Sequence, residues 1–482
     1  MGELRFAVIG AGMAGVLSAI ELRRAGYSNF TVYEKGHTLG GTWRENTYPG
    51  IACDVPSHYY SYSFALNPDW SQRFAEGPEI HAYFERVARE RDVLRHMRFG
   101  DEVSRLEYAN GRWRLETAGG HHDEVDAVIA ATGVLHHLNW PDIPGLADFA
   151  GPCFHSARWD HDVALEGARV GVVGTGSSAV QITGALAGRV AGYKLFQRTA
   201  QWIMPQDNPP YTDEERESFH EHPELLQQTH DDIGRLFTGF SSGLVKADSP
   251  EMQGIADACL ANLEENVRDP ELRERLRPTY RAACKRLVLS TNFYDAIQHP
   301  DSELVTAGIE RVEPGGVRTR DGVLHELDVL VLATGFRVDR FLRPIEVVGR
   351  GGLRLEEAWE KRPLAYLSIS IPEFPNLFML NGPNGPVGNF SLISIAELQF
   401  AYILQLIEKL DGAGCREVSV RRDATLAFEA QRTEAARSTI WSSGCSSWYL
   451  DDRGIPSTWP WTYDRFCEEM AGPKLENFEL VG

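Results

Sequence analysis

The fold is decided by two stretches of the same kind, RFAVIGAGMAG at residues 5–15 and RVGVVGTGSSA at residues 169–179. Each opens with an apolar strand pattern, passes through closely spaced glycines and continues into a helical pattern. In a G-x-G-x-x-G turn the first glycine permits the tight turn, the second lets the backbone approach a pyrophosphate, and the third lets helix and strand pack closely. The helix N-terminus then faces the negative charge. The two stretches therefore predict two dinucleotide-binding folds.

The residue at the end of the second strand indicates which nucleotide each fold binds. In the first fold it is Glu34, whose carboxylate can accept hydrogen bonds from a ribose diol, as in FAD or NAD sites. In the second fold it is Arg198, whose guanidinium can pair with a 2′-phosphate and stack on adenine, which favours NADPH over NADH. The predicted nucleotide contacts are Gly10, Gly12, Gly15 and Glu34 in the first fold and Gly174, Gly176, Ser177, Ser178, Arg198 and Thr199 in the second.

Two later strands divide the chain further. Residues 126–133 and 328–335 both begin with an acid, continue through an apolar run rich in β-branched residues and end in Ala-Thr-Gly. This repetition predicts that they are late strands of the two folds, with domain junctions near residue 140 and beyond residue 336. Between them, residues 209–284 are charged and helical in pattern, with helix-start signals at Thr212 and Asp269. We therefore expect a helical insertion in the second fold.

Composition excludes several classes of function. The chain has 482 residues, enough for about three domains, and its 43% hydrophobic and 24% charged residues are typical of a globular protein. A net charge of −20 repels phosphate backbones and anionic lipids, so we expect no nucleic-acid partner and no membrane partner. Residues 391–410 combine apolar residues at helical spacing with several polar ones, which predicts a core-facing amphipathic helix.

Cysteine and histidine usage points away from disulfides and metals. The seven cysteines are scattered and never form a C-x-x-C pair, which speaks against a disulfide framework and against a zinc site. A reducing, cytoplasmic location fits this pattern, and no signal-peptide pattern precedes the first strand. The histidine pairs at residues 121–122 and 136–137 have no acidic or cysteine partner at metal spacing, so we expect solvated loops there and no metal.

Two longer motifs connect the folds. Residues 40–54, GGTWRENTYPGIACD, follow the strand that ends in Glu34, and residues 149–160, FAGPCFHSARWD, lie between the two folds. With these motifs the chain resembles the type I Baeyer–Villiger monooxygenases, a branch of the class B flavoprotein monooxygenases. Trp159 is the more discriminating position, because related enzymes that act on nitrogen or sulfur generally carry a tyrosine there. The resemblance adds Gly41, Thr42 and Trp43 to the predicted cofactor contacts.

The resemblance also implies the architecture. The expected fold class is α/β, with two Rossmann-like dinucleotide-binding domains, for FAD and NADPH, and a helical insertion in the NADPH domain. The implied division gives residues 1–140 to the FAD-binding domain, 141–371 to the NADPH-binding domain with its insertion at 207–285, and 372–482 to a return to the FAD-binding domain and a C-terminal loop. Residues 375–378 and the turn at 382–383 are then expected to lie against the flavin.

Several site residues are assigned by the same resemblance. Arg286 is expected to stand over the flavin ring, and the adjacent Lys285 to meet the 2′-phosphate of NADPH. Asp54 is expected to pair with Arg286 and keep it aimed. His155 is expected to fix the crossing between domains, and Trp448 either lies near nicotinamide and substrate on a mobile loop or belongs to an ordinary surface loop.

The implied activity is a flavin-dependent oxygenation. The enzyme would use FAD, NADPH and O2 to insert one oxygen atom next to the carbonyl of a small-molecule ketone, through a flavin C4a-peroxide, and release an ester or lactone. The guanidinium of Arg286 would hold the peroxide in its anionic form. Three alternatives remain open: a flavin monooxygenase that oxidises nitrogen or sulfur, a flavin disulfide reductase, whose redox cysteine pair is absent, and a non-catalytic dinucleotide-sensing protein.

Overall fold

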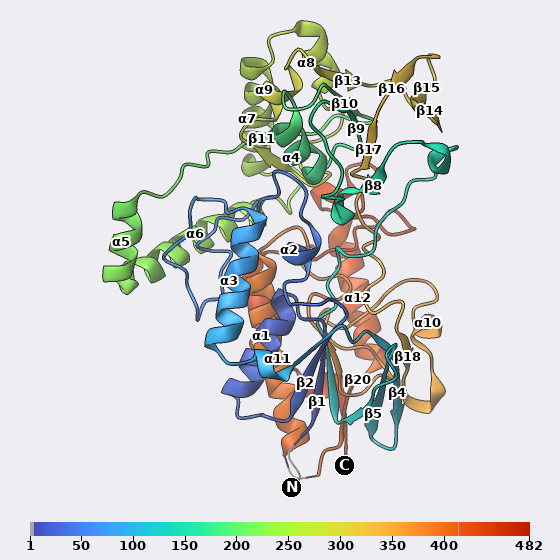
Figure 1. The fold of residues 1–482 in the computed structure, drawn as a ribbon. Helices are drawn as coiled ribbons and strands as arrows, with labels where there is room; N and C mark the ends of the chain where they lie inside the picture. Colours follow the sequence, from blue (N-terminus) through green and yellow to red (C-terminus); the bar gives the residue numbers. More distant parts are fainter. Residues whose placement is uncertain (1–3, 413) are drawn as a thin grey trace.

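The computed structural model describes residues 4–412 and 414–482. Its chain forms two lobes, with both termini at the end of the lower lobe (Figure 1). The lower lobe holds the strands nearest the termini, and the upper lobe holds the middle of the chain. Within the described residues, no helix is both long enough and apolar enough to cross a membrane.

The lower lobe is built on a parallel sheet of five strands in the order β19-β7-β1-β2-β3. Its strands are β1 (Phe6–Ile9), β2 (Phe30–Glu34), β3 (Met97–Phe99), β7 (Ala127–Ala130) and β19 (Leu377–Met379). Alternate side chains of β1 enter two different cores: Phe6 and Val8 face the helices, and Ala7 and Ile9 face a second, antiparallel sheet. Both faces of the sheet are therefore buried, as its continuous apolar strands require.

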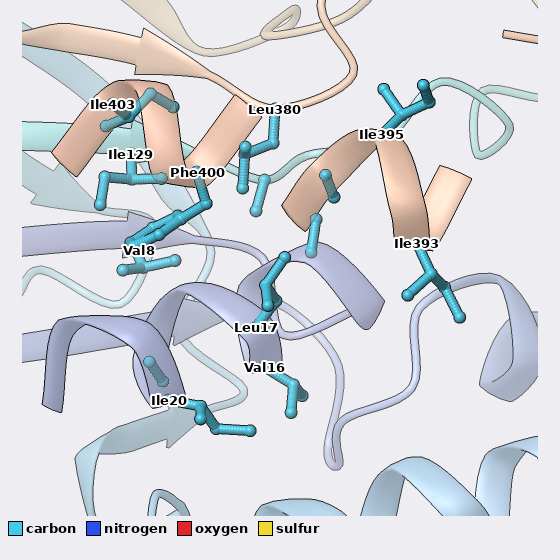
Figure 2. Packing of buried hydrophobic residues seen from close by; sticks show 14 of the residues in the cluster. Val8, Val16, Leu17, Ile20, Ile129, Leu380, Ile393, Ile395, Phe400 and Ile403 are labelled. Carbon is cyan, nitrogen blue, oxygen red and sulfur yellow. The ribbon is translucent and has the colours of Figure 1, made fainter. Parts of the chain in front are cut away.

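Two long helices cover one face of this sheet. These are α1 (Met13–Arg24) and α11 (Leu392–Asp411), and Figure 2 shows Phe400 of α11 beside Val8 and Ile129 of the sheet. The helix expected at residues 391–410 is confirmed as α11, and its apolar stripe is buried, including Ile393, Ile403 and Phe400. Because α11 follows β19 late in the chain, the C-terminal segment completes the core begun by residues 6–34.

The upper lobe contains a second parallel sheet in the order β13-β10-β9-β17-β8. Its strands are β8 (Cys153–His155), β9 (Arg169–Val173), β10 (Gly192–Phe196), β13 (Ser302–Val305) and β17 (Val329–Leu332). The helices α4 (Ser177–Leu186) and α9 (Phe293–Ile297) pack with this sheet. Each predicted glycine turn thus joins the central strand of a parallel sheet to a helix, β1 to α1 and β9 to α4.

Smaller elements complete the two lobes. One antiparallel sheet contains β4 (Val103–Ala109), β5 (Arg112–Thr117) and β6 (His122–Val125), with β18 (Glu346–Val348) parallel to β4. A second contains β14 (Ile309–Glu313), β15 (Gly316–Thr319) and β16 (Leu324–Glu326). Two short pairs are β11 (Ile203–Pro205) with β12 (Val288–Ser290) and β20 (Glu417–Val420) with β21 (Phe478–Val481). The remaining α-helices outside the insertion are α2 (Thr42–Glu45), α3 (Gly77–Glu90), α10 (Leu355–Ala358), α12 (Arg422–Ala436) and α13 (Tyr463–Met470).

The helical insertion bridges the two lobes. It consists of α5 (Asp213–Glu221), α6 (Pro223–Gly243), α7 (Pro250–Asn266) and α8 (Pro270–Leu276). Both predicted helix starts are confirmed, since Thr212 forms a capping box with Glu215 and Asp269 accepts a hydrogen bond from the N–H of Glu271. Phe237 of α6 packs against the core of the lower lobe, whereas Leu263 of α7 belongs to the core of the upper lobe.

The segment at residues 375–378 has a structural role that the sequence did not indicate. Asn376 is buried with a φ of 57° and joins three parts of the lower lobe. Its Nδ2 donates to the carbonyls of Asp126 (3.0 Å) and Arg416 (2.9 Å), and its Oδ1 accepts from the N–H of Val418 (2.8 Å). The side chain therefore holds β19 and β20 at the edge of the sheet.

We expect Asn376→Ala to lower the free energy of unfolding by about 2–4 kcal/mol, because one buried and two partly buried backbone groups lose their partner. The measurement is urea denaturation of the purified protein. Asn110→Ala is the matched control: Asn110 has a φ of 55° but is exposed, so it isolates the cost of alanine at a positive φ. Equal losses in the two variants would show that the hydrogen bonds of Asn376 contribute nothing.

Candidate active site

A cavity of about 290 Å³ lies at the ends of the lower-lobe strands. It is lined by six of the predicted cofactor residues: Gly10, Gly12, Glu34, Gly41, Thr42 and Trp43. Gly15 does not line it. A Cβ on Gly15 would stand 1.8 Å from the carbonyl oxygen of Gly10, so this glycine serves the close packing of helix on strand.

Two glycine turns pack against each other at the wall of this cavity. A Cβ on Gly41, which has a φ of +52°, would stand 2.9 Å from the Cα of Gly12. Gly12 is also the N-cap residue of α1, and no side chain caps that end of the helix. The first N–H groups of the helix lack intrahelical partners. The bare helix N-terminus and the two side-chain-free turns make a cradle for an anionic group.

Glu34 is fixed at the wall of the cavity. Its carboxylate is 5% exposed and accepts hydrogen bonds from the N–H of Ala11 (2.8 Å) and of Gly36 (2.7 Å). Arg44 pairs with the same carboxylate at 2.7 Å and also lines the cavity. The sequence analysis missed Arg44, which it quoted only as a letter inside the 40–54 motif. Its guanidinium compensates the charge of a carboxylate that is almost completely buried.

The second glycine turn leaves free space beside Gly176. Gly174 has a φ of +125°, and a Cβ there would stand 2.3 Å from the carbonyl oxygen of Ala333. At Gly176, by contrast, a Cβ would meet nothing within 4 Å, and no side chain caps the helix that starts there. Ser178 donates to the hydroxyl of Tyr48 at 3.1 Å, so it is engaged with the lower lobe, whereas Ser177 opens the helix beside Gly176.

Two cations lie together near this turn. Arg198 is exposed at the end of β10, and the carbonyl of the next residue, Thr199, accepts a hydrogen bond from Thr175 at 2.9 Å. Burial and the charge of Arg198 lower the pKa of Lys285, whose Nζ lies 4.6 Å from the ring centroid of Tyr280. Neither cation forms an ion pair with any carboxylate in the part of the chain that the structure describes. Two neighbouring cations without a carboxylate partner are suited to bind an anion such as a phosphate.

Arg286 and Asp54 form an ion pair across 232 residues of sequence. One guanidinium nitrogen donates to the Asp54 carboxylate, and the other donates to the carbonyl of Gly388 at 2.6 Å. Burial lowers the pKa of Arg286, but the Asp54 carboxylate and the Tyr449 hydroxyl raise it further, so the net shift is upward. The guanidinium therefore stays charged at every working pH.

His155 joins the crossing between the lobes to the second Ala-Thr-Gly turn. The ring is fully buried, its Nδ1 accepts from the N–H of Ala157 at 3.1 Å, and its Nε2 therefore donates to the carbonyl of Gly335 at 3.1 Å. Burial lowers the pKa of His155, which keeps this tautomer neutral. Trp159 packs edge-on against Phe154 at 5.1 Å. These contacts agree with a positional role for His155.

The prediction of solvated loops is wrong for the histidine pair at 136–137. Both rings are half-buried and line the cavity. Nε2 of His137 lies 2.7 Å from the carbonyl oxygen of Arg343, and burial together with His137 lowers the pKa of His136 to about 3. The pair follows the first Ala-Thr-Gly turn, where the chain folds back over the cavity. In the other pair, His122 is exposed but begins strand β6, and His121 is half-buried beside the hydroxyl of Tyr33, so the prediction of a solvated loop is wrong there too.

The expected contact of residues 375–378 and of the turn at 382–383 with the flavin stays a prediction. These residues form the start of β19 and do not line the cavity, and neither does the turn at 382–383. From this part of the chain, only Asn381 and Leu392 line it. β19 is the edge strand of the sheet, and the chain reaches this cavity only after the strand has ended.

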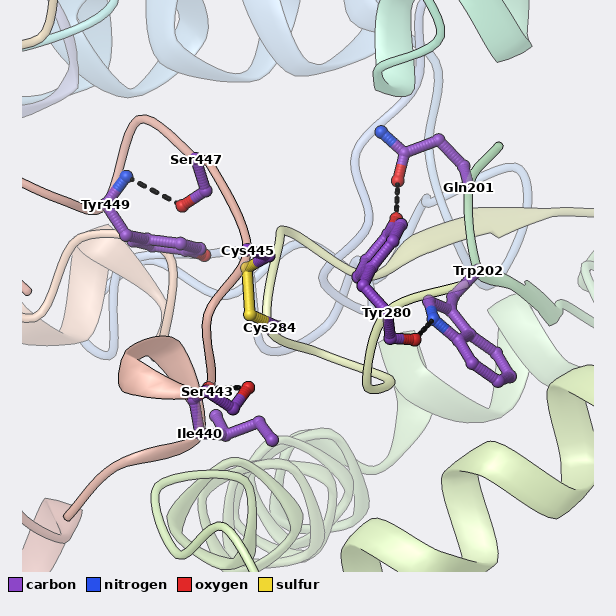
Figure 3. The surroundings of a disulfide bond; sticks show 9 residues. All are labelled: Gln201, Trp202, Tyr280, Cys284, Ile440, Ser443, Cys445, Ser447 and Tyr449. Carbon is purple, nitrogen blue, oxygen red and sulfur yellow. Dashed lines mark hydrogen bonds between the residues drawn. A yellow bond between two sulfur atoms is a disulfide. The ribbon is translucent and has the colours of Figure 1, made fainter. Parts of the chain in front are cut away.

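The expectation that the cysteines form no disulfide is wrong at one position. Cys284 and Cys445 form a disulfide between the loop that precedes Arg286 and the C-terminal loop (Figure 3). Their separation of 161 residues leaves no spacing signal in the sequence. The other five cysteines are free, and the described residues contain no cluster that could hold a metal ion.

Two adjacent aromatic residues of the C-terminal loop differ in how far they are exposed to solvent. Trp448 is 39% exposed and stacks on Tyr449 with ring centroids 4.1 Å apart. Tyr449 itself is 2% exposed and lies against the Arg286 site, where its hydroxyl donates to the carbonyl of Gly388. The sequence analysis singled out Trp448 and missed Tyr449. The only feature of the sequence that could have indicated Tyr449 is its position next to Trp448.

We expect the disulfide to be measurable by counting thiols. Alkylation of the denatured, unreduced protein should modify five cysteines, and prior reduction should raise the number to seven, as read by intact mass. Cys445→Ser should lower the free energy of unfolding by about 2–4 kcal/mol, because the bridge no longer restricts the unfolded chain. Cys153→Ser, at a free and half-buried cysteine, is the control. Seven modified cysteines without reduction would contradict the bridge.

Comparison with known proteins identifies the family. Residues 3–209 match the family model described as flavin-binding monooxygenase-like. A Baeyer–Villiger monooxygenase of Streptomyces coelicolor is 38% identical over 99% of this chain and 93% of its own. An uncharacterised monooxygenase of Mycobacterium tuberculosis is 46% identical over 98% and 95%. The crystal structure of cyclohexanone monooxygenase from Rhodococcus, bound to NADP⁺, superimposes with a TM-score of 0.89 at 30% identity over 99% of both chains, which confirms the predicted fold class. The chain belongs to the Baeyer–Villiger monooxygenases, a branch of the flavin-binding monooxygenases.

Proposed function

We propose that this protein is an FAD- and NADPH-dependent monooxygenase that inserts one oxygen atom of O2 next to the carbonyl of a small-molecule ketone and releases an ester or lactone. The family relationship supports the reaction and both cofactors. The observation that carries the proposal is the ion pair of Arg286 with Asp54. Asp54 ends the 40–54 segment, whose first residues line the cavity. Arg286 directly follows Lys285, one of the two cations beside the second glycine turn.

The residues around the cavity suit FAD. Gly10, Gly12 and Gly41 leave the backbone open to a diphosphate, and the uncapped start of α1 faces the same space. Glu34 is already held by two N–H groups and still has lone pairs for a ribose diol. Thr42 and Trp43 complete the wall, and the Nε1 of Trp43 donates to the hydroxyl of Tyr60 at 3.1 Å, which fixes the indole.

The residues at the second glycine turn suit NADPH. The open space at Gly176 and the uncapped start of α4, with Ser177 and Ser178, would receive the diphosphate. Arg198 and Lys285 would pair with the 2′-phosphate, and Thr199 lies beside Arg198. The absence of a carboxylate partner for either cation, among the residues described, supports this assignment.

Arg286 supplies the fixed positive charge of the reaction. The bound flavin supplies the activation of O2, and NADPH supplies the electrons. Arg286 stays protonated, and its contacts with Asp54 and Gly388 hold the guanidinium in place, so it can stabilise negative charge that develops on oxygen without having to reorient. Asp54 acts through Arg286. Cys53 and Val55, which flank Asp54, are buried and anchor the backbone that carries the aspartate.

The division of the chain into domains is part of this proposal. We assign residues 1–140 and 372–482 to FAD binding and residues 141–371 to NADPH binding, with the insertion at 207–285. The membership of β1 and β19 in one sheet and of β8 and β17 in the other supports this division. We also propose a cytoplasmic location, which the five free cysteines support and the single disulfide does not.

The first functional prediction concerns cofactor preference. Losing a charged contact to phosphate costs roughly 1.5–3 kcal/mol, so Arg198→Ala should reduce the preference for NADPH over NADH by about ten- to a hundredfold. The measurement is kcat/KM with each nucleotide. Arg189→Ala, which removes an exposed arginine of the same lobe, should leave the preference intact. An unchanged preference in Arg198→Ala would remove this residue from the NADPH site.

The second functional prediction separates oxygen insertion from cofactor binding. Arg286→Met should leave FAD bound, because none of the cavity-lining groups is altered, yet lower ester formation by about two to three powers of ten. Electrons from NADPH should then appear as hydrogen peroxide. The measurement is ester and peroxide formed per NADPH consumed. Arg311→Ala, on the remote strand β14, is the control. Normal ester yield in Arg286→Met would exclude the proposed role.

A further inference from the structure

The phenol of Tyr449 is held by aromatic packing. Its ring stacks on Trp448 at 4.1 Å and lies 5.5 Å from the ring of Trp441, which is itself 4% exposed. The N–H of Tyr449 donates to the hydroxyl of Ser447 at 3.0 Å, which bends the loop at this point (Figure 3). With the ring fixed on both sides, the position of the hydroxyl is fixed as well.

The Tyr449 hydroxyl and the Arg286 guanidinium share one carbonyl. The oxygen of Gly388 accepts from Arg286 at 2.6 Å and from Tyr449 at 3.4 Å, so both donors meet at one carbonyl, and the nearby phenol contributes to the raised pKa of Arg286. Burial raises the pKa of Tyr449, so the phenol is neutral and can donate to the carbonyl. The guanidinium is thus held by Asp54 through one nitrogen and, through the other, by the Gly388 carbonyl to which Tyr449 also donates.

Gly388 admits this arrangement because it lacks a side chain. Its φ is +87°, and a Cβ there would stand 2.5 Å from the Tyr449 hydroxyl and 2.9 Å from its ring. The ring therefore lies directly against the Cα of Gly388. Any other residue at this position would push the phenol away from the arginine.

The disulfide fixes the two loops relative to each other at the same place. Cys445 precedes Tyr449 by four residues, and Cys284 precedes Arg286 by two. A covalent bridge this close to both residues leaves little freedom for the hydroxyl to move away from the guanidinium. Two independent attachments, one covalent and one through Gly388, bring Tyr449 to Arg286.

We propose that Tyr449 is a positioning residue for Arg286: by donating to the Gly388 carbonyl, its hydroxyl fixes the acceptor of the guanidinium nitrogen that does not bind Asp54. The inference rests on the proposed function, because it concerns the arginine that stabilises charge in oxygen insertion. Tyr449 touches neither oxygen nor substrate in this role. Its effect is on how often the charge is correctly aimed when oxygen reacts.

The test is Tyr449→Phe, which keeps the ring and removes only the hydroxyl. In the FAD-loaded enzyme, ester per NADPH should fall about tenfold and hydrogen peroxide should rise to match, while KM for the ketone and for NADPH stays within about twofold. Tyr402→Phe is the matched control, because Tyr402 is 1% exposed and its hydroxyl has no hydrogen-bond partner among the described residues. Unchanged partition between ester and peroxide in Tyr449→Phe would overturn the proposal.

A second measurement does not depend on ester formation. Thermal unfolding is compared for the wild type, Tyr449→Phe, Arg286→Met and the double variant. If the hydroxyl acts through Arg286, Tyr449→Phe should lower the Tm of the wild type and have at most half that effect when Arg286 is already methionine. Additive shifts would overturn the proposal even if ester yield falls. Coupled shifts in an enzyme that forms no ester from any ketone would support the contact and reject the proposed function.

Discussion

The ion pair between Arg286 and Asp54 is the contact on which the arrangement of the candidate site depends. It joins a loop that leaves the first cavity to a loop that leaves the helical insertion, across 232 residues of sequence. Two partly buried charges lose solvation, and a pair of this kind is favourable only when further hydrogen bonds satisfy both groups. The carbonyl of Gly388 provides one such bond to the arginine. Three segments that are distant in sequence must therefore come together before the charge of the guanidinium is compensated and its position is fixed.

The parts of the fold that could be predicted are those where a short stretch of backbone has only one solution. Gly10 and Gly174 have positive φ values, and a Cβ on either would clash with the carbonyl oxygen of the alanine in the neighbouring Ala-Thr-Gly segment. Local geometry therefore requires both the glycine and its spacing to the helix. Glu34 and Arg198 follow because each ends the strand next to such a turn. The same reasoning holds for α11, whose apolar stripe repeats at helical spacing over twenty residues.

The parts that could not be predicted depend on contacts between distant segments. Nothing near Cys284 in the sequence indicates Cys445, and nothing near Gly388 indicates that a tyrosine ring covers its Cα. The histidines at 136–137 read as polar loop residues because their burial comes from residues 341–345, two hundred positions later. Family resemblance supplied the pairing of Asp54 with Arg286, but it offered no partner for the opposite side of the guanidinium.

The position of the arginine loop at the junction of the lobes explains why it needs several attachments. The insertion packs through α6 on the lower lobe and through α7 on the upper lobe, and Arg286 follows directly after it. Any relative movement of the lobes would therefore be transmitted to the guanidinium. An electrostatic group contributes most when it costs no reorganisation at the moment of reaction. The disulfide, the aspartate and the shared Gly388 carbonyl each tie the arginine loop to another segment of the chain, so together they oppose displacement of the charge when the lobes move.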